Sequence, residues 1–142
     1  MPLEPIYKLR DWIPLEKLYW EKLVENTHPG VFPLLEKRKF LKDFKKEKSV
    51  MHTYKIGISN NPSAIDYLSN HMDEIDWREL TLNPNAIPLI EKNLDRINWE
   101  WLSANPNAIH ILEKHQDKIR WDTLSRNENA IHMLEQNPDK ID

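Results

Sequence analysis

The chain has no cysteine and only two glycines among its 142 residues. Without cysteine it can form no disulfide, no thiolate zinc site and no cysteine nucleophile. Gly30 and Gly57 are isolated, so the chain contains neither of the glycine-rich loops that hold nucleotide phosphates. These absences exclude thiol chemistry and disfavour nucleotide-binding enzymes of those classes.

Long apolar runs are also lacking. No segment approaches the roughly 18 consecutive apolar residues that a membrane-spanning helix needs. Residues 1–10 do not contain the apolar stretch of a signal peptide. We therefore expect a protein that is not secreted and does not enter a membrane, and that is either intracellular or packaged inside a particle.

What the chain does contain is a 22-residue period over residues 59–142. Four segments align without gaps: 59–80, 81–102, 103–124 and 125–142. The recurring columns include Asn61, Asn83, Asn105 and Asn127, then Ala64, Ala86, Ala108 and Ala130, then Ile75, Ile97, Ile119 and Ile141, and finally Trp77, Trp99 and Trp121. Columns of this regularity indicate one supersecondary unit that repeats along the chain.

Each unit predicts two short helices. Asn followed by Pro is typical of an N-cap and the first helical residue, so helix A of the second unit is expected over about 84–92. Its apolar positions Ala86, Ile87 and Ile90 share one face at helical spacing. A shorter helix B, partly 3₁₀, should carry Trp99.

The ends of these helices have their own predicted signals. Four equivalent residues should take the left-handed conformation that ends helix A, namely His71, Asn93, His115 and Asn137. Helix B has two candidate cap positions. One is the column of Asp73, Asp95, Asp117 and Asp139, and the alternative is Asp76 with Glu79 in a capping pattern.

Two short helices per 22 residues cannot bury their apolar faces alone, so neighbouring units must stack. The sequence therefore predicts an all-α protein, a right-handed α-solenoid of stacked 22-residue helix-turn-helix repeats. Residues 1–58 should form a divergent N-terminal helical cap, continuous with the array in one domain. "FPLLEK", residues 32–37, matches "IPLIEK", residues 87–92, as part of a degenerate repeat. A prolonged helix over 34–48 and a linker over 49–58 should follow.

Charge divides the chain into two parts. Residues 1–58 carry 12 Lys and Arg against 8 Asp and Glu, whereas residues 59–142 carry 8 against 15. The acidic array should repel nucleic acid, which makes nucleic acid an unfavoured partner. A basic run is a solvated helix face, an electrostatic contact to the acidic array, or a patch that binds nucleic acid or another anionic surface. It consists of Lys37, Arg38, Lys39, Lys42, Lys45, Lys46 and Lys48.

No combination of residues predicts catalysis or a metal site. His110 and His132 are one repeat apart, about 10 Å from helix packing distances, which is too far to share a metal ion. The recurring serines have no histidine and acid at a spacing that suggests a nucleophile. We therefore expect a non-enzymatic protein with no catalytic residue, no metal and no cofactor.

Two surfaces remain as candidates for partners. The variable positions of the repeat that should face solvent are Asp66, Pro88, His110 and His132, and we expect them to form a protein-binding surface. The last unit lacks the tryptophan that closes the others. This predicts an apolar flank at Ile131, Met133 and Leu134 that is covered either by another chain, in a homo-oligomer, or by the helix's own orientation.

The composite unit WxxLSxNPNAIxxLEKNxDxI is carried here by "WEWLSANPNAIHILEKHQDKI", residues 99–119. It resembles a repeat that occurs in many proteins of giant double-stranded DNA viruses of amoebae, including the Marseillevirus-like group. The resemblance covers residues 59–142 well and residues 11–37 weakly. It implies a viral protein in the virion or in the host cytoplasm or nucleus, and it carries no catalytic residues over.

We expect the protein to be an interaction or scaffold module with a viral or host protein as partner. Binding of nucleic acid or an anionic surface through residues 37–48 is one alternative. Self-assembly as a virion component is the other.

Overall fold

The computed structural model describes residues 19–36 and 48–141, and the regular structure in these two ranges is entirely helical. The α-helices are α1 (Trp20–Leu23), α2 (Phe32–Glu36), α4 (Lys48–Asn60), α5 (Ile65–Asn70), α6 (Trp77–Leu82), α7 (Ile87–Ile90), α8 (Trp99–Ala104), α9 (Ile109–Lys114), α10 (Trp121–Leu124) and α11 (Ile131–Gln136). Short 3₁₀ turns are η2 (Pro29–Val31), η3 (Met72–Glu74), η4 (Pro84–Ala86), η5 (Gln116–Lys118), η6 (Glu128–Ala130) and η7 (Pro138–Lys140). The all-α prediction is confirmed. None of these helices combines the length and apolarity that crossing a bilayer requires.

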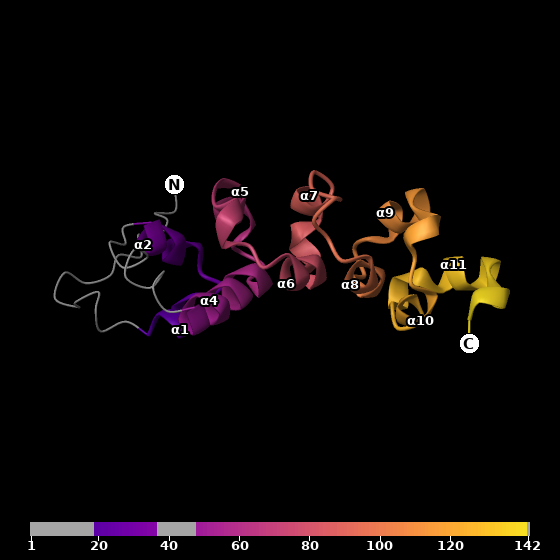
Figure 1. The fold of residues 1–142 in the computed structure, drawn as a ribbon, viewed down its shortest axis with the longest axis horizontal. Helices are drawn as coiled ribbons and strands as arrows, with labels where there is room; N and C mark the ends of the chain where they lie inside the picture. The colour runs from indigo at the N-terminus through magenta and orange to yellow at the C-terminus, as the bar shows by residue number, and fades with distance from the viewer. Residues whose placement is uncertain (1–18, 37–47, 142) are drawn as a thin grey trace, which may run out of the picture.

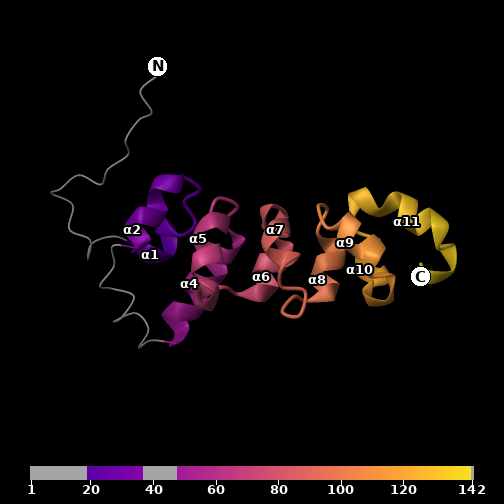
Figure 2. The ribbon, with the colours of Figure 1, turned by 90° about the horizontal axis from the view of Figure 1, so that it is seen from above.

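The helices follow one another along an elongated molecule (Figure 1). Helices α5, α7 and α9 lie in one row, and α4, α6, α8 and α10 lie in the other. Seen from above, the order along the long axis is the order in the sequence (Figure 2). Contacts within the second row join α4 to α6, α6 to α8 and α8 to α10. Each helix therefore packs mainly on neighbours that are close in the sequence.

The start of helix A is built as the asparagine and proline predict. The side-chain oxygen of Asn83 accepts a hydrogen bond from the backbone N–H of Asn85 at 3.1 Å. Pro84 then begins the 3₁₀ turn η4, which leads directly into α7. The predicted helix over 84–92 is thus a 3₁₀ turn followed by an α-helix that ends at Ile90, two residues early.

The predicted left-handed ends of helix A are wrong, because no described residue other than glycine has a positive φ. The φ angles of His71 and Asn137 are −132° and −135°. Their side chains instead reach back to the last turn, His71 Nδ1 to the Tyr67 carbonyl at 2.8 Å and Asn137 Nδ2 to the Met133 carbonyl at 2.9 Å. Asn93 does the same. A side chain that satisfies a terminal carbonyl removes the need for a left-handed residue.

Helix B is capped at the alternative position. Oδ1 of Asp76 accepts from the N–H groups of Arg78 and Glu79, and Asn98 caps α8 in the same way. The Asp73 column is not the cap. Asp73, Asp117 and Asp139 lie inside the 3₁₀ turns η3, η5 and η7, three residues before the helix B cap position.

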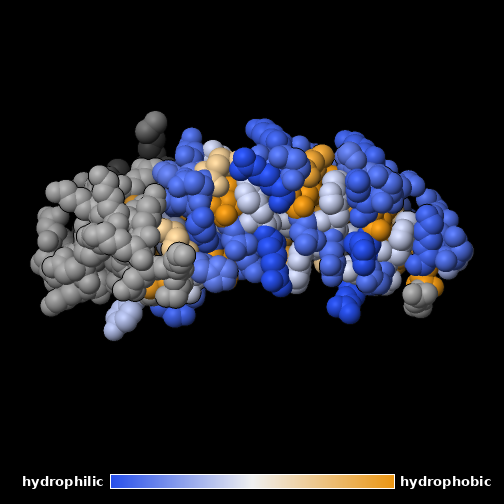
Figure 3. All heavy atoms as spheres, in the orientation of Figure 1, coloured by the Kyte–Doolittle hydropathy of each residue, from blue (hydrophilic) through white to orange (hydrophobic). Residues whose placement is uncertain are grey.

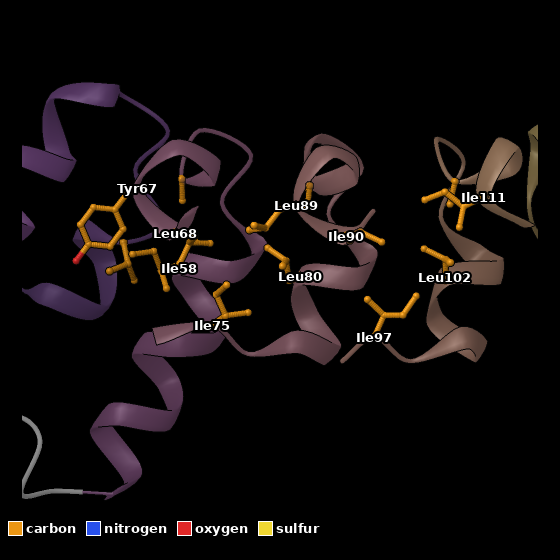
Figure 4. Packing of buried hydrophobic residues seen from close by; sticks show 14 of the residues in the cluster. Ile58, Tyr67, Leu68, Ile75, Leu80, Leu89, Ile90, Ile97, Leu102 and Ile111 are labelled. Carbon is orange, nitrogen blue, oxygen red and sulfur yellow. The ribbon is translucent and has the colours of Figure 1, made fainter. Parts of the chain in front are cut away.

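The core is a stack of apolar side chains between the two rows of helices (Figure 4). Leu80 and Leu102 from the helix B row and Ile90 from the helix A row have no exposed surface. Ala86, which is also fully buried, keeps one position of each unit small so that backbones can approach. Since each unit adds only a few apolar residues to this stack, burial depends on having neighbours on both sides.

The N-terminal described segment repeats the plan of the later units. Helix α1, turn η2 and helix α2 follow one another as α6, η4 and α7 do. Two residues are inserted at the cap, and both Asn26 and His28 act as caps. The Asn26 side chain accepts from the His28 N–H at 2.9 Å, and His28 Nδ1 accepts from the Gly30 N–H at 3.0 Å.

Residues 49–58 are not a linker. They belong to α4 (Lys48–Asn60), whose 13 residues make it twice as long as α6 or α8, with 6 each. The predicted boundary between residues 58 and 59 therefore falls inside a helix. The helix predicted over 34–48 is described only to the end of α2 at Glu36, since residues 37–47 lie outside the described ranges.

Candidate interaction surfaces

The asparagine column joins consecutive units. Its four members are at most 3% exposed. Each donates from Nδ2 to two backbone carbonyls of the preceding segment at 2.7–3.3 Å: Asn61 to Val24 and Asn26, Asn83 to Ser59 and Asn61, Asn105 to Thr81 and Asn83, and Asn127 to Ser103 and Asn105. Because Oδ1 caps the local turn at the same time, one side chain serves both its own unit and its neighbour. The sequence indicated the cap but not this second role.

Two further polar columns extend the same connection. Ser59 Oγ accepts from the Asp76 N–H at 2.8 Å, and the equivalent Ser103 accepts from the Arg120 N–H at 3.1 Å. A second asparagine, two residues after the first, donates to the proline carbonyl of the preceding unit. These pairs are Asn85 to Pro62, Asn107 to Pro84 and Asn129 to Pro106. The recurring polar residues are therefore occupied in holding the units together.

The four variable positions predicted as a partner surface are all exposed: Asp66, Pro88, His110 and His132. His110 Nε2 lies 2.9 Å from Oε1 of Glu91 in the preceding unit, and His132 Nε2 lies 3.0 Å from Oε1 of Glu113. Asp66 lines a hollow of about 320 Å³ together with Phe32. The face shown in Figure 3 is mostly hydrophilic, with smaller hydrophobic areas between the polar side chains. This row thus presents two equivalent pairs of Glu and His, one residue of each pair coming from the preceding unit.

The predicted apolar flank is smaller than expected. Ile131 is 60% exposed, but Met133 is only 4% exposed and Leu134 is half-buried. Met133 is covered because α11 turns this side chain into the core. Ile141, with 40% of its surface exposed, is the other large apolar side chain exposed in this part of the chain.

The basic run lies almost entirely outside the described residues. Its last member, Lys48, is the first residue of α4, and residues 37–47 are not among those described. Binding of an anionic surface through this run therefore stays a prediction.

The junction between α4 and the first regular unit contains a buried polar cluster that the sequence reading missed. The hydroxyl groups of Tyr54 and Tyr67 both donate to Oε2 of Glu74, at 2.8 and 2.9 Å. All three residues are at most 5% exposed. Burial, and then the nearby Glu74 charge, raise the pKa of Tyr54 well above its usual value. Tyr67 also stacks on Phe32 and on His71, with ring centroids 5.6 and 4.0 Å apart.

The repeat alignment explains why this cluster is unusual. Residue 55 is equivalent to the tryptophans that begin helix B, and residue 74 is equivalent to Arg96, Lys118 and Lys140. In the array a cation lies over an indole, with Arg96 Cζ 5.6 Å from the Trp77 ring and Lys140 Nζ 4.9 Å from the Trp121 ring. The junction has Lys55 and Glu74 instead. Extending the tryptophan column back to Lys55 and the basic column back to Glu74 would have revealed this exception in the sequence.

None of the described side chains form a group of three or more histidines and acids that could hold a metal ion. Comparisons of the chain with family models, with curated proteins and with solved structures found no match.

Proposed function

We propose that the chain is an α-solenoid that acts as a protein-binding or scaffold module rather than as an enzyme. The observation that carries this proposal is the recurrence of the same buried contacts every 22 residues. Solenoids of this kind build extended surfaces from the positions that the stack leaves free. The resemblance to the repeat of giant viruses supports a viral protein with a viral or host protein as partner.

The exposed row supports a protein partner over a small substrate. This exposed position changes from Asp66 to Pro88 and then to His110 and His132, whereas the buried asparagine and alanine columns do not vary. A binding surface of a repeat protein varies at exposed positions while the contacts that join the units recur. The buried column of Tyr67, Leu89, Ile111 and Met133 also varies, but only among side chains that fill the core. The paired Glu91 and His110 add polar groups that a partner can recognise.

Affinity capture of the tagged full chain from the cells that produce it, followed by mass spectrometry, tests this function. We expect a protein that is retained by the wild type and lost when the four variable positions are all changed to alanine. A matched control changes four exposed acids elsewhere, Glu100, Asp117, Glu128 and Glu135, to alanine and should retain the partner. Failure to recover any protein, combined with turnover of a substrate by the pure chain, would contradict the proposal.

Self-association is the second candidate, and the exposed side chain of Ile131 favours it. A large apolar side chain with 60% of its surface in water gains free energy when another chain covers it. Sedimentation equilibrium over a hundredfold range of concentration should show a rising mean mass, and Ile131→Glu should abolish the rise. A mass that stays monomeric over the whole range would contradict self-association.

A further inference from the structure

A hollow of about 350 Å³ at the junction is lined by Met51, Lys55, Asp73 and Glu74. It lies where α4 meets the turn η3. Glu74 is 4% exposed and yet borders this hollow. A nearly buried carboxylate at the edge of a cavity is a strong anchor for a ligand, because charge interactions gain strength as water is removed.

Only one of the two oxygens of the Glu74 carboxylate accepts hydrogen bonds from the described residues. Both tyrosine hydroxyl groups donate to Oε2, while Oε1 accepts no hydrogen bond from any residue in the described ranges. An ionised carboxylate has room for about four hydrogen bonds on its two oxygens. Leaving a buried acceptor without a donor is unfavourable. Oε1 is therefore the atom to which a ligand in the hollow would donate.

The charges around the hollow favour a cation. Asp73 and Glu74 bring two carboxylates, and Lys55 brings one ammonium group, whose Nζ donates to the backbone carbonyl of Asp73. Among the described residues Glu74 has no ion-pair partner, because its two donors are neutral phenols and the Lys55 ammonium is directed to the Asp73 carbonyl. An anionic ligand would be repelled by the Glu74 carboxylate, and a neutral ligand would leave this carboxylate without a counter-ion.

The hollow also has a clear origin in the repeat. Lys55 occupies the position of Trp77, Trp99 and Trp121, so a flexible chain replaces a large ring. Glu74 occupies the position at which Arg96 lies over the Trp77 ring. The exchange removes side-chain volume and places an acid where the array has a base. The junction therefore has an acid and a hollow at the two positions where the array has a base over an indole ring.

We propose that this hollow binds an arginine side chain of a partner polypeptide. The guanidinium group donates to Oε1 of Glu74, and the aliphatic part of the side chain contacts Met51. Arginine fits better than lysine because its planar guanidinium is more weakly hydrated and is the more readily withdrawn from water. This inference rests on the proposed protein-binding function and names the chemistry of one contact within it.

Titration of the full chain with N-acetyl-arginine amide tests the inference directly. The methyl signal of Met51 and the amide signals of Asp73 and Glu74 are followed by two-dimensional NMR. We expect saturable shifts with the arginine compound. N-acetyl-citrulline amide, which has nearly the same shape and no charge, should bind at least tenfold more weakly.

Variants at the hollow sharpen the test. Glu74→Gln keeps a carbonyl oxygen for the two phenols but places an N–H₂ group where the second acceptor was, and should weaken binding at least tenfold. Lys55→Trp should fill the hollow and abolish binding. Lys55→Met removes the competing positive charge and should tighten binding at least threefold, and Glu100→Gln, on α8, should leave it unchanged. Circular dichroism and thermal unfolding confirm that each variant is folded.

The outcomes separate this inference from the proposed function. Absence of saturable shifts in the folded wild type, or equal affinity in Glu74→Gln, overturns the arginine site. If affinity capture still recovers a partner in that case, the protein-binding function survives without this contact. If the arginine compound binds but no protein is captured, the site stands and the proposed function fails.

Discussion

The regular units from α6 to α10 and the junction around Glu74 share one backbone plan but use it differently. In the regular units the position of residue 74 is held by an exposed base such as Arg96 or Lys118. At the junction the same position is a buried acid. The difference arises because α4 extends about two turns beyond the start of α6 or α8, which places Tyr54 over Glu74. The extra length of α4 therefore buries a position of the repeat that is exposed to solvent in the other units.

The comparison also separates two ways of using buried polar groups. The asparagine column satisfies its own hydrogen bonds within the stack, since Asn105 caps one unit and donates to two carbonyls of another. The junction leaves one carboxylate oxygen without a donor among the described residues. The first arrangement serves stability, and the second leaves a group available for binding.

The largest expected effect comes from breaking the array at Asn105. Asn105→Ala removes three hydrogen bonds at a site that is 1% exposed and leaves the carbonyls of Thr81 and Asn83 without this donor. Buried polar groups left without partners cost about 1–3 kcal/mol each, so we expect a loss of about 3–5 kcal/mol of unfolding free energy. Urea unfolding followed by circular dichroism measures it.

The exposed Asn107, two residues further along the chain, is the matched control for this variant. Asn107→Ala removes a hydrogen bond to the Pro84 carbonyl at an exposed site, where water replaces the lost partner. We expect it to cost only about 0.5–1 kcal/mol. Equal losses for Asn105→Ala and Asn107→Ala would show that burial of the column is not what stabilises the stack.

The array was predictable from the sequence to the extent that local chemistry repeats. Asn83 followed by Pro84 indicated the cap, and the apolar columns indicated the core, because both depend on short-range rules that recur in every unit. The carbonyl partners of Asn105 were not predictable, since they depend on how closely two units stack. The alternative cap at Asp76 was visible in the sequence, but choosing between it and Asp73 required the length of the intervening turn.

The junction was less predictable because it depends on a single exception. The charge and the apolar residues of 49–58 do not distinguish a linker from a helix, and the length of α4 decides whether Glu74 is buried. Likewise the residue type of His71 predicts a left-handed helix end, whereas its side-chain hydrogen bond to the Tyr67 carbonyl ends the helix without one. The sequence does not show which helix covers Glu74, nor which carbonyl the His71 side chain contacts.

The second largest effect is expected at Tyr54. Tyr54→Phe removes a donor to the buried Glu74 carboxylate, and hydrogen bonds to charged groups contribute about 1.5–3 kcal/mol. We expect a loss of about 2 kcal/mol at neutral pH, measured by urea unfolding. Tyr19→Phe, at a side chain that is 81% exposed, is the control and should change nothing measurable.

The same variant has a pH dependence of known sign. Burial raises the pKa of Tyr54 in the folded state, so the unfolded chain releases this proton first as the pH rises. The stability that the neutral phenol contributes is complete below pH of about 10, the ordinary value for tyrosine, and declines above it. Wild type should therefore lose its advantage over Tyr54→Phe at alkaline pH. A difference that stays constant through pH 11 would show that Tyr54 is not protected from ionisation.

A smaller effect is expected at Gly57, where the junction needs a close approach that the array does not. A Cβ at this position would lie 2.7 Å from Cγ2 of Val24, a fully buried and stiff side chain. Overpacking costs about 1–3 kcal/mol, and the better helix propensity of alanine returns about 1 kcal/mol. We expect Gly57→Ala to destabilise the protein by about 1 kcal/mol.

Val24→Ala supplies the matched background for that measurement. With the smaller side chain opposite, the added Cβ has space, so Gly57→Ala should become stabilising by about 0.5 kcal/mol relative to Val24→Ala alone. Thermal unfolding of the four proteins in this cycle measures the change of sign. The same destabilisation in both backgrounds would mean that the contact with Val24 is not why glycine occupies this position.

The smallest effect is expected on the exposed row, at the pair of Glu91 and His110. Both side chains are nearly half exposed, 47% and 45%, so solvent and salt screen their interaction. Glu91→Gln should change the unfolding free energy by less than about 0.5 kcal/mol. The equivalent change at Glu113, which faces His132, should behave alike. If these two variants also weaken capture of the partner protein, the exposed row of Asp66, Pro88, His110 and His132 serves recognition. That result would complete the contrast with Asn105, where the same kind of polar side chain serves the stack.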